Sequence, residues 1–322
     1  MKAIGIILAG GNNNRMKELT AKRAVPALPV AGSFRSIDFA LSSMSNSHIQ
    51  TVAVLTQYNA RSLNEHLSSS KWWNFGRKQG GLFLFTPTVT ADNSDWYRGT
   101  ADAMYQNIDF LKRRHEPYVI ISSGDCVYKL DFNRVLDFHI EKKSDITVVC
   151  KDMMYNDDVS RFGVVRMDDE SRITEFDEKP IEALSNTIST GIYVIRRRQL
   201  IELLEAAAEE NRFDFVNDIL VRYKNVKKIY GYKINSYWNN IADIDAYFKT
   251  NMDFLRPDVR SYFFREEPTI CSKVDDLPPA KFNPGSDISN SLVSSGCIIN
   301  GSVEDSVLFK QVFVGKNTTV KN

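Results

Sequence analysis

Short, continuous apolar runs alternate with helical stretches along this chain, and this alternation restricts its fold more than any other feature. The first run, Ala3-Ile-Gly-Ile-Ile-Leu8, lacks the period-2 pattern of a half-exposed strand, which predicts a strand buried on both faces. Similar runs follow at Thr51–Leu55, Tyr118–Ser122 and Asp145–Cys150. Helical patterns lie between them, as at Ala101–Arg114 and Leu130–Lys142. The chain is therefore expected to form an α/β domain on a mostly parallel sheet, with the first run as its central strand.

The same texture continues to about Leu255. Between Gln199 and Asn211 the apolar residues follow the spacing of an amphipathic helix, and a second helical stretch begins near Phe215. We therefore assign residues 1–255 to one α/β domain. Residues 256–284 contain five prolines, which disfavour regular structure and predict a linker.

Residues 285–322 have a different pattern. Leu292 and Ile298 are six residues apart, and so are Leu308, Val314 and Val320. Hexapeptide spacing predicts a left-handed parallel β-helix, although the gap from Ile298 to Leu308 breaks the register and leaves an irregular β segment as the alternative. The roughly two coils fall short of the three or so that stability usually needs, so we expect a truncated β-helix or one completed by packing.

Composition excludes several classes of function. The chain of 322 residues has 41 basic and 40 acidic residues, so no overall field attracts nucleic acid or an anionic membrane. Its four cysteines are widely spaced, which argues against a disulfide framework and a structural zinc site. The apolar run at the start is too short to span a bilayer. We expect a soluble, cytoplasmic protein whose partners are small ligands or other proteins.

A loop rich in glycine and asparagine follows the first apolar run, in the segment Leu8-Ala-Gly-Gly-Asn-Asn-Asn-Arg15. Backbone N–H groups of Gly10 and Gly11 could face phosphates there, and Arg15 could add a charged fork. The spacings of a Rossmann fingerprint and of a P-loop are both absent. A tight strand–helix connection is the alternative interpretation of this loop.

Several blocks resemble, in the same order, those of the ADP-glucose pyrophosphorylase (glucose-1-phosphate adenylyltransferase) family. They are Leu8–Arg15, Leu19-Thr-Ala-Lys-Arg-Ala24, Arg35-Ser-Ile-Asp-Phe39, Trp96-Tyr-Arg-Gly-Thr-Ala-Asp102, Gly124-Asp125, Phe176-Asp-Glu-Lys-Pro180, Thr190-Gly-Ile-Tyr193 and Pro278-Pro-Ala-Lys-Phe282. The resemblance covers nearly the whole chain. It implies a Rossmann-like nucleotidyltransferase domain followed by a left-handed β-helix. It also implies a reaction in which the phosphate of glucose 1-phosphate attacks the α-phosphorus of ATP and pyrophosphate leaves.

The resemblance also assigns roles to residues. It implies nucleotide binding by Gly10, Gly11, Arg15, Gly99 and Asp102, and sugar-phosphate binding by Glu178, Lys179 and Tyr97. Asp125 matches the first aspartate that holds Mg²⁺, and it follows an apolar run where α/β sheets place their ligands. The alternatives are a helix N-cap for Asp125 and an exposed ion pair for Glu178 and Lys179.

Several positions depart from the family pattern. Val25 stands where active members carry a lysine, and Asn240 replaces the second metal aspartate. An amide oxygen brings no charge, so Mg²⁺ is expected to be weakly bound or absent. The other departures are Asn13 for a loop glycine, Asn217 for a lysine, Ala242-Asp243 for Gly-Thr, and Ser33 where the family typically has an effector-binding lysine.

These departures lead to a specific hypothesis. Loss of one preorganised charge partner commonly lowers a rate by about 10²–10³-fold, so little turnover is expected. The pattern resembles the D-type regulatory subunit of bacterial glycogen synthesis, which implies a catalytic homologous subunit in a heterotetramer and binding of glucose 1-phosphate, ADP-glucose or ATP. A fully active enzyme is the main alternative. A β-helix acyltransferase is less favoured, because no histidine falls in the hexapeptide region.

Overall fold

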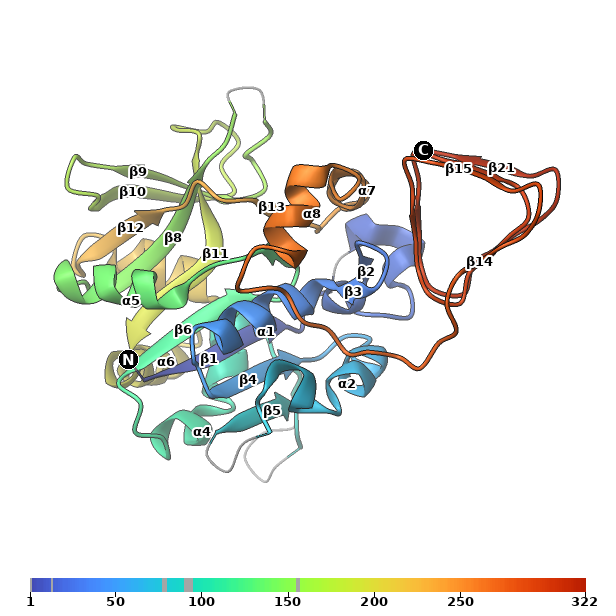
Figure 1. Ribbon diagram of the computed structural model, residues 1–322. Helices are drawn as coiled ribbons and strands as arrows, with labels where there is room; N and C mark the ends of the chain where they lie inside the picture. The colour runs from blue at the N-terminus through green and yellow to red at the C-terminus, as the bar shows by residue number, and fades with distance from the viewer. Residues whose placement is uncertain (1, 13, 77–79, 90–94, 155–156) are drawn as a thin grey trace.

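The computed structural model describes residues 2–12, 14–76, 80–89, 95–154 and 157–322 (Figure 1). Its main body is built on one sheet of nine strands. These strands are β1 (Ala3–Ala9), β4 (Thr51–Thr56), β5 (Gly81–Phe85), β6 (Tyr118–Ser123), β8 (Ile146–Asp152), β9 (Gly163–Met167), β10 (Ile173–Glu178), β11 (Thr187–Arg196) and β12 (Ile229–Lys233). They follow the order β10-β9-β11-β6-β1-β4-β5, and β8 pairs with both β11 and β12.

The sheet is mostly parallel. Strand β1 lies between β4 and β6 and pairs in parallel with both. Among the strands described for this sheet, β10 and β11 alone run against the others. The predicted mostly parallel sheet, with the first apolar run inside it, is confirmed.

Helices cover both faces of the sheet. On one side lie α1 (Ser36–Asn46), α2 (Arg61–Leu67) and α5 (Phe132–Glu141), and on the other α3 (Thr100–Tyr105), α4 (Ile108–Lys112) and α6 (Arg197–Glu209). Strand β1 contacts both helical layers, because Ile7 packs with the first set of helices and Ile4 and Ile6 pack with the second. A strand buried on both faces needs apolar residues at successive positions, which explains the unbroken run in the sequence.

The single helix expected over Ala101–Arg114 is wrong, since α3 and α4 are separate. Asn107 stands between them outside the helical region, with φ −110° and ψ 21°. Its side-chain amide donates to the Ala103 carbonyl and to the Tyr97 hydroxyl, both at 2.9 Å. A short polar side chain that bonds a helix carbonyl competes with the backbone pattern, and here it ends α3.

Two helices close the main body at its C-terminal end, α7 (Ile244–Asp253) and α8 (Pro257–Phe264). Helix α8 falls inside residues 256–284, where regular structure was not expected, so this expectation is wrong for that stretch. Pro257 occupies the first turn, where its missing N–H and fixed φ favour a helix. Val259 and Phe263, one turn apart, are buried in the core.

Smaller elements complete the body. Strand β7 (Cys126–Tyr128) pairs antiparallel with β13 (Trp238–Asn240), and β2 (Pro29–Val30) pairs with β3 (Phe34–Arg35). Short 3₁₀ segments cover Asn14–Thr20, Val25–Ala27 and Ser70–Trp73, and Val216–Val221 forms a π-helical turn. None of the helices described is long and apolar enough to cross a membrane.

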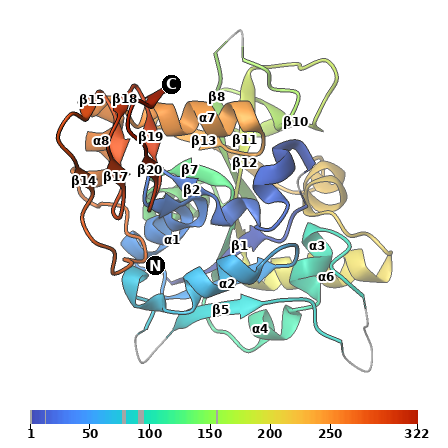
Figure 2. The ribbon, with the colours of Figure 1, turned by 90° about the vertical axis from the view of Figure 1, so that its right-hand side faces the viewer.

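The C-terminal segment forms a parallel β-helix that stands beside the main body, coloured red in Figures 1 and 2. Its strands are β14 (Lys281–Phe282), β15 (Asp287–Ser289), β16 (Leu292–Val293), β17 (Ile298–Ile299), β18 (Ser302–Glu304), β19 (Val307–Leu308), β20 (Phe313–Val314) and β21 (Thr319–Lys321). They stack into three ladders, β14-β17-β20, β15-β18-β21 and β16-β19. The hexapeptide β-helix prediction is confirmed.

The inward positions of the β-helix differ in part from those in the sequence pattern. Leu308 and Val314 are buried as expected, but Ile298 is 40% exposed. Its neighbour Ile299 is buried instead and pairs with Val314 on the next coil. Successive side chains of a strand point to opposite faces, so the sequence pattern was one residue out of register at this point.

Candidate active site

Two cavities open where β1, β4 and β6 end, at the carboxyl edge of the parallel strands. The first has a volume of about 490 Å³ and the second about 390 Å³. The first is lined by Gly10, Gly11, Val25, Gln57, Tyr58, Tyr97, Arg98, Gly99 and Thr100, among others. The second is lined by residues that include Arg15, Arg161, Gly163, Glu178, Lys179, Trp238 and Asn240. Ser123 and Asp125 line both, so the two cavities adjoin at these side chains.

Asp125 occupies the junction of the two cavities. Its Oδ1 accepts a hydrogen bond of 2.5 Å from the Ser123 hydroxyl, and its carbonyl accepts one of 3.0 Å from the Ile241 N–H. The residue leads into strand β7, so the alternative of a helix N-cap is wrong. Asp131 caps the following helix, α5, instead. The fold therefore presents the Asp125 carboxylate to both cavities.

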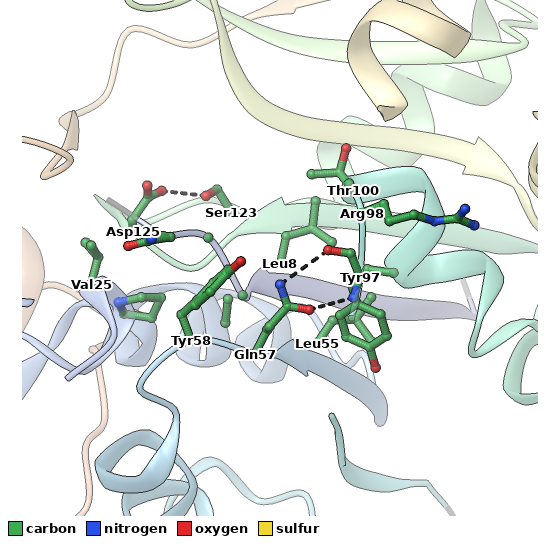
Figure 3. Close-up of a pocket in the computed structure, with 17 residues that line it drawn as sticks. Leu8, Val25, Leu55, Gln57, Tyr58, Tyr97, Arg98, Thr100, Ser123 and Asp125 are labelled. Atoms are coloured by element: carbon green, nitrogen blue, oxygen red, sulfur yellow. Dashed lines mark hydrogen bonds between the residues drawn. The ribbon is translucent and has the colours of Figure 1, made fainter. Parts of the chain in front are cut away.

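Val25 lies beside Asp125 at the same end of the first cavity (Figure 3). It begins the 3₁₀ segment with Pro26 next to it, and only 5% of its surface is exposed. Its cluster of buried apolar residues includes Met16, Phe39 and Val127. The wall therefore presents an apolar surface at the position where the family resemblance implies a cation.

Asn240 lies at the end of β13, directly opposite Cys126 of β7. Its Oδ1 accepts a hydrogen bond of 3.0 Å from the Ala242 N–H, and its Nδ2 lies 3.4 Å from the Cys126 Sγ. Burial, reinforced by the Asp125 charge, raises the pKa of the Cys126 thiol, so this sulfur stays protonated. Neither neighbour adds a negative charge beside Asp125.

These side chains fit Mg²⁺ poorly. Mg²⁺ prefers hard oxygen ligands, with carboxylates supplying the charge. Asp125 offers one carboxylate, whereas the Asn240 amide is neutral and its oxygen already accepts a hydrogen bond. Within the ranges of the chain that the structure describes, no group of three or more His, Cys, Asp or Glu residues could hold a metal ion.

Asp102, predicted to bind nucleotide, lines neither cavity. It is buried, and its Oδ2 accepts hydrogen bonds from the Arg98 N–H at 2.8 Å and from Gln106 Nε2 at 3.0 Å. Its carboxylate therefore holds the backbone that enters α3. Gly99, which the resemblance groups with Asp102, does line the first cavity.

Gly99 lets two parts of the chain approach closely. The Phe213 carbonyl accepts hydrogen bonds from the N–H groups of Ala101 and Asp102, at 2.8 and 3.2 Å. A Cβ added at Gly99 would lie 2.3 Å from that same oxygen, closer than any real contact. The segment around Phe213 would have to move away from the start of α3.

Gly99→Ala should therefore destabilise the protein by about 1–3 kcal/mol and weaken nucleotide binding, because overpacking shifts the backbone beside the first cavity. Urea unfolding and titration with ATP would measure the two effects. Gly11→Ala is the control for stability, since a Cβ there meets nothing within 4 Å. Equal stability of the two variants would contradict the close-approach argument.

Tyr97 lies in the first cavity, whereas Glu178 and Lys179, with which it was grouped, line the second. Its N–H donates to Gln57 Oε1 at 2.7 Å, and Gln57 Nε2 donates to its carbonyl at 3.3 Å (Figure 3). The hydroxyl accepts a hydrogen bond from Asn107. Gln57 thus fixes the Tyr97 backbone, a role that sequence inspection missed.

Glu178 and Lys179 lie together at the end of β10. Lys179 Nζ is 3.3 Å from Glu178 Oε1, and the Glu178 side chain is 16% exposed while that of Lys179 is 63% exposed. Burial raises the pKa of the Glu178 carboxyl, and the Lys179 charge partly opposes that shift. Gly163, across the β9–β10 hairpin, leaves room for the Glu178 side chain, since a Cβ there would lie 2.9 Å from Oε2. The second cavity thus holds a half-buried carboxylate beside a solvated cation.

Two arginines line the second cavity with this pair. Arg15, which was grouped with Gly10 and Gly11 for nucleotide binding, lies here and does not line the first cavity with them, and Arg161 was not predicted. Burial lowers the pKa of the Arg161 guanidinium, and the nearby charge of Arg15 lowers it further, while Asp158 opposes the shift. Arg161 stands two residues before Gly163, the hairpin partner of Glu178. The sequence analysis did not single out Arg161, because the pairing of Gly163 with Glu178 is seen only in the fold.

Other predicted positions lie away from the two cavities. Asn217 is exposed, and its N–H donates to Asp214 Oδ1. Ser33 lines a separate cavity together with Trp72, Lys273 and Lys310. Asn13 lies outside the described residues. The arrangement as a whole can bind a phosphorylated ligand through cations in the second cavity and a further group in the first.

Comparison with known proteins defines the class to which this fold and site belong. Residues 4–256 match the nucleotidyl transferase family, and residues 278–322 match the GlmU-like C-terminal hexapeptide family. Glucose-1-phosphate adenylyltransferases are similar over almost the whole chain. That of Clostridium novyi is 38% identical over 98% of this chain and 84% of its own length. Those of Pseudothermotoga lettingae and Geobacillus stearothermophilus are 40% and 36% identical over 99% of this chain, covering 76% and 83% of their own lengths.

This chain therefore belongs to the glucose-1-phosphate adenylyltransferase family of nucleotidyl transferases. The family resemblance of the sequence blocks is confirmed. Val25 and Asn240, where the resemblance implies a lysine and an aspartate in active members, line the two cavities that adjoin at Asp125.

Proposed function

We propose that this chain is a regulatory, catalytically weak subunit of glucose-1-phosphate adenylyltransferase. The full enzyme would join ATP and glucose 1-phosphate to give ADP-glucose and pyrophosphate, the activity that gives its relatives their name. One observation carries the proposal: of the two cavities that adjoin at Asp125, one has the buried Val25 in its wall and the other has the neutral amide of Asn240. Catalysis of phosphoryl-group transfer depends on fixed charges that stabilise the developing negative charge, and two of these are missing here.

The two cavities suggest how the ligands would be divided. The adenosine nucleotide would occupy the first cavity, over Gly10 and Gly11, and glucose 1-phosphate would occupy the second, beside Glu178 and Lys179. Lysine and arginine charges suit the phosphate, and a carboxylate suits sugar hydroxyls as a hydrogen-bond acceptor. Mg²⁺ would be held weakly by Asp125, since the second ligand contributes no charge.

A catalytic homologue would supply the activity that this chain lacks. On the β14-β17-β20 ladder, Ile298 and Phe313 are neighbours in register and are 40% and 68% exposed. Adjacent exposed apolar side chains are typical of surfaces that contact another protein. A heterotetramer with the catalytic subunit would cover them.

Co-expression with a catalytic glucose-1-phosphate adenylyltransferase from the same source should give one mixed species that survives size-exclusion chromatography. We expect Phe313→Asp to reduce the mixed fraction, because a charge in a buried contact is costly. Phe248→Asp, at an exposed site on α7, is the matched control. If the chain instead eluted as a stable monomer, separate from the co-expressed catalytic homologue, the partner hypothesis would be contradicted.

The main alternative is a fully active enzyme acting alone. Asp125, Arg15, Glu178 and Lys179 all line the cavities, and their presence favours this alternative. Its discriminating measurement is the turnover of the isolated chain.

A further inference from the structure

Asp243 makes two different contacts with its two carboxylate oxygens. Oδ1 accepts a hydrogen bond of 2.8 Å from the Ala246 N–H and so caps the first turn of α7. Oδ2 forms an ion pair with the guanidinium of Arg161. The Arg161 and Asp243 side chains are 25% and 22% exposed, so the pair is screened less than a surface pair.

Arg161 is held on the wall of the second cavity. Its guanidinium carbon lies 5.2 Å from the centre of the Phe162 ring, and that ring meets Trp238 edge-on at 5.6 Å. Trp238 belongs to β13 and is buried, which anchors the stack. Arginine presents a planar fork of donors that matches carboxylate and phosphate oxygens alike.

We propose that Asp243 is an internal competitor for the phosphate of the bound ligand, because its carboxylate occupies the guanidinium of Arg161 in the second cavity. This inference rests on the proposed function in one respect, that a sugar phosphate binds in the second cavity. A phosphate reaching Arg161 must displace the carboxylate or share the guanidinium with it. Either outcome lowers the affinity of a cavity whose other cations, Arg15 and Lys179, favour anions.

The cap of α7 does not require a charge at Asp243. Asparagine and threonine serve as N-caps about as well as aspartate, through a side-chain oxygen. The negative charge therefore has its main effect on Arg161. Asp243→Asn removes the competitor and keeps the cap, and Asp243→Thr does the same with a smaller side chain.

The test is calorimetric titration of the full chain with inorganic phosphate and, separately, with glucose 1-phosphate. We expect Asp243→Asn to bind both about tenfold more tightly than the wild type, which is about 1.4 kcal/mol. In an Arg161→Ala background the same substitution should produce almost no gain. The four proteins form a double-mutant cycle whose coupling measures competition for the guanidinium.

Asp131→Asn is the matched control. Asp131 also caps a helix, α5, and also lies near an arginine, Arg134 at 3.6 Å, but it lines neither cavity. It should leave both affinities unchanged, and Asp243→Thr should reproduce the gain if Asp243→Asn folds poorly.

The outcomes separate this inference from the proposed function. No gain with Asp243→Asn and Asp243→Thr would overturn the inference, and so would a gain that persists fully without Arg161, which would indicate simple charge repulsion. A gain for inorganic phosphate alone, with no binding of glucose 1-phosphate by any variant, would support competition at Arg161 and count against the proposed ligand.

Discussion

The isolated chain should release pyrophosphate from ATP and glucose 1-phosphate at a rate well below the usual enzymatic range of about 1–10³ per second. The double substitution Val25→Lys with Asn240→Asp should raise that rate by about 10²–10³-fold. Lysine would return a cation to the triphosphate, and aspartate would return a charged ligand to Mg²⁺. Each position lines a cavity together with Asp125, so both substitutions are expected to act on the same developing charge.

Each substitution alone should help little, and the pair should exceed the product of the single effects. A metal held by two carboxylates and a cation on the same phosphates stabilise one transition state, so their contributions are coupled. The ion pair of Asp243 with Arg161 in the second cavity would still limit the rescue. Adding Asp243→Asn to the double variant therefore tests whether this ion pair limits the rate independently of the charges missing at Val25 and Asn240.

The residues around Val25 and Asn240 determine whether the introduced lysine and aspartate can be accommodated without other changes. The carboxylate introduced by Asn240→Asp could still accept the Ala242 N–H, and its second oxygen would face the Cys126 thiol, a weak donor that is already directed to Asp125 Oδ1 at 3.5 Å. Val25 is buried, so a lysine must extend its ammonium into the first cavity while its stem stays in the apolar wall. Val25→Met is the control for size without charge.

Steady-state pyrophosphate release, with purified single and double variants and saturating Mg²⁺, is the measurement. Wild-type turnover within the usual enzymatic range would refute the regulatory proposal and favour the active enzyme. A double variant as slow as the wild type, yet folded, would show that these two positions are not what limits the rate.

Local signals in the sequence were enough to predict a mostly parallel sheet and its first strand. Strand β1 is read from its own residues, because burial on both faces requires an unbroken apolar run. Asp125 could likewise be placed, since it follows a buried strand at the edge where parallel strands end. The resemblance then identified Val25 and Asn240 as positions of interest. The burial of Val25 and the hydrogen bonds of Asn240 could be learned only from the structure.

The Arg161–Asp243 pair could not be predicted. Its partners come from the turn before β9 and from the cap of α7, far apart in the sequence, and nothing local to Arg161 marks it as the partner of Asp243. Asp102 is a second residue whose contacts the sequence did not predict. Its place in a matching block indicated ligand binding, but a carboxylate at the start of a helix is also suited to hold backbone N–H groups, and that is its role here.

The proline-rich sequence of residues 256–284 does not predict helix α8, because proline usually interrupts regular structure. Pro257 is tolerated at the first turn, and the apolar pair at Val259 and Phe263 gives the helix a buried stripe. Phe263 contacts Phe39 of α1 with ring centres 5.3 Å apart, and it also meets Phe254, Tyr237 and Tyr262. The segment expected to be a linker thus begins as part of the main body's core.

Phe263→Ala should consequently lower the free energy of unfolding by about 3–5 kcal/mol, the usual cost of removing a fully buried aromatic side chain. Phe263 is completely buried, whereas Phe248 on α7 is 51% exposed, so Phe248→Ala is the matched control and should cost far less. Urea unfolding followed by tryptophan fluorescence is a suitable measurement, since Trp73 and Trp238 are buried in the body.

If residues 257–264 acted only as a connection to the β-helix, the two alanine variants would unfold at the same urea concentration. A large loss confined to Phe263→Ala would instead place α8 in the cooperative core that supports both cavities, because Tyr237, one of its contacts, lies next to β13 and three residues from Asn240.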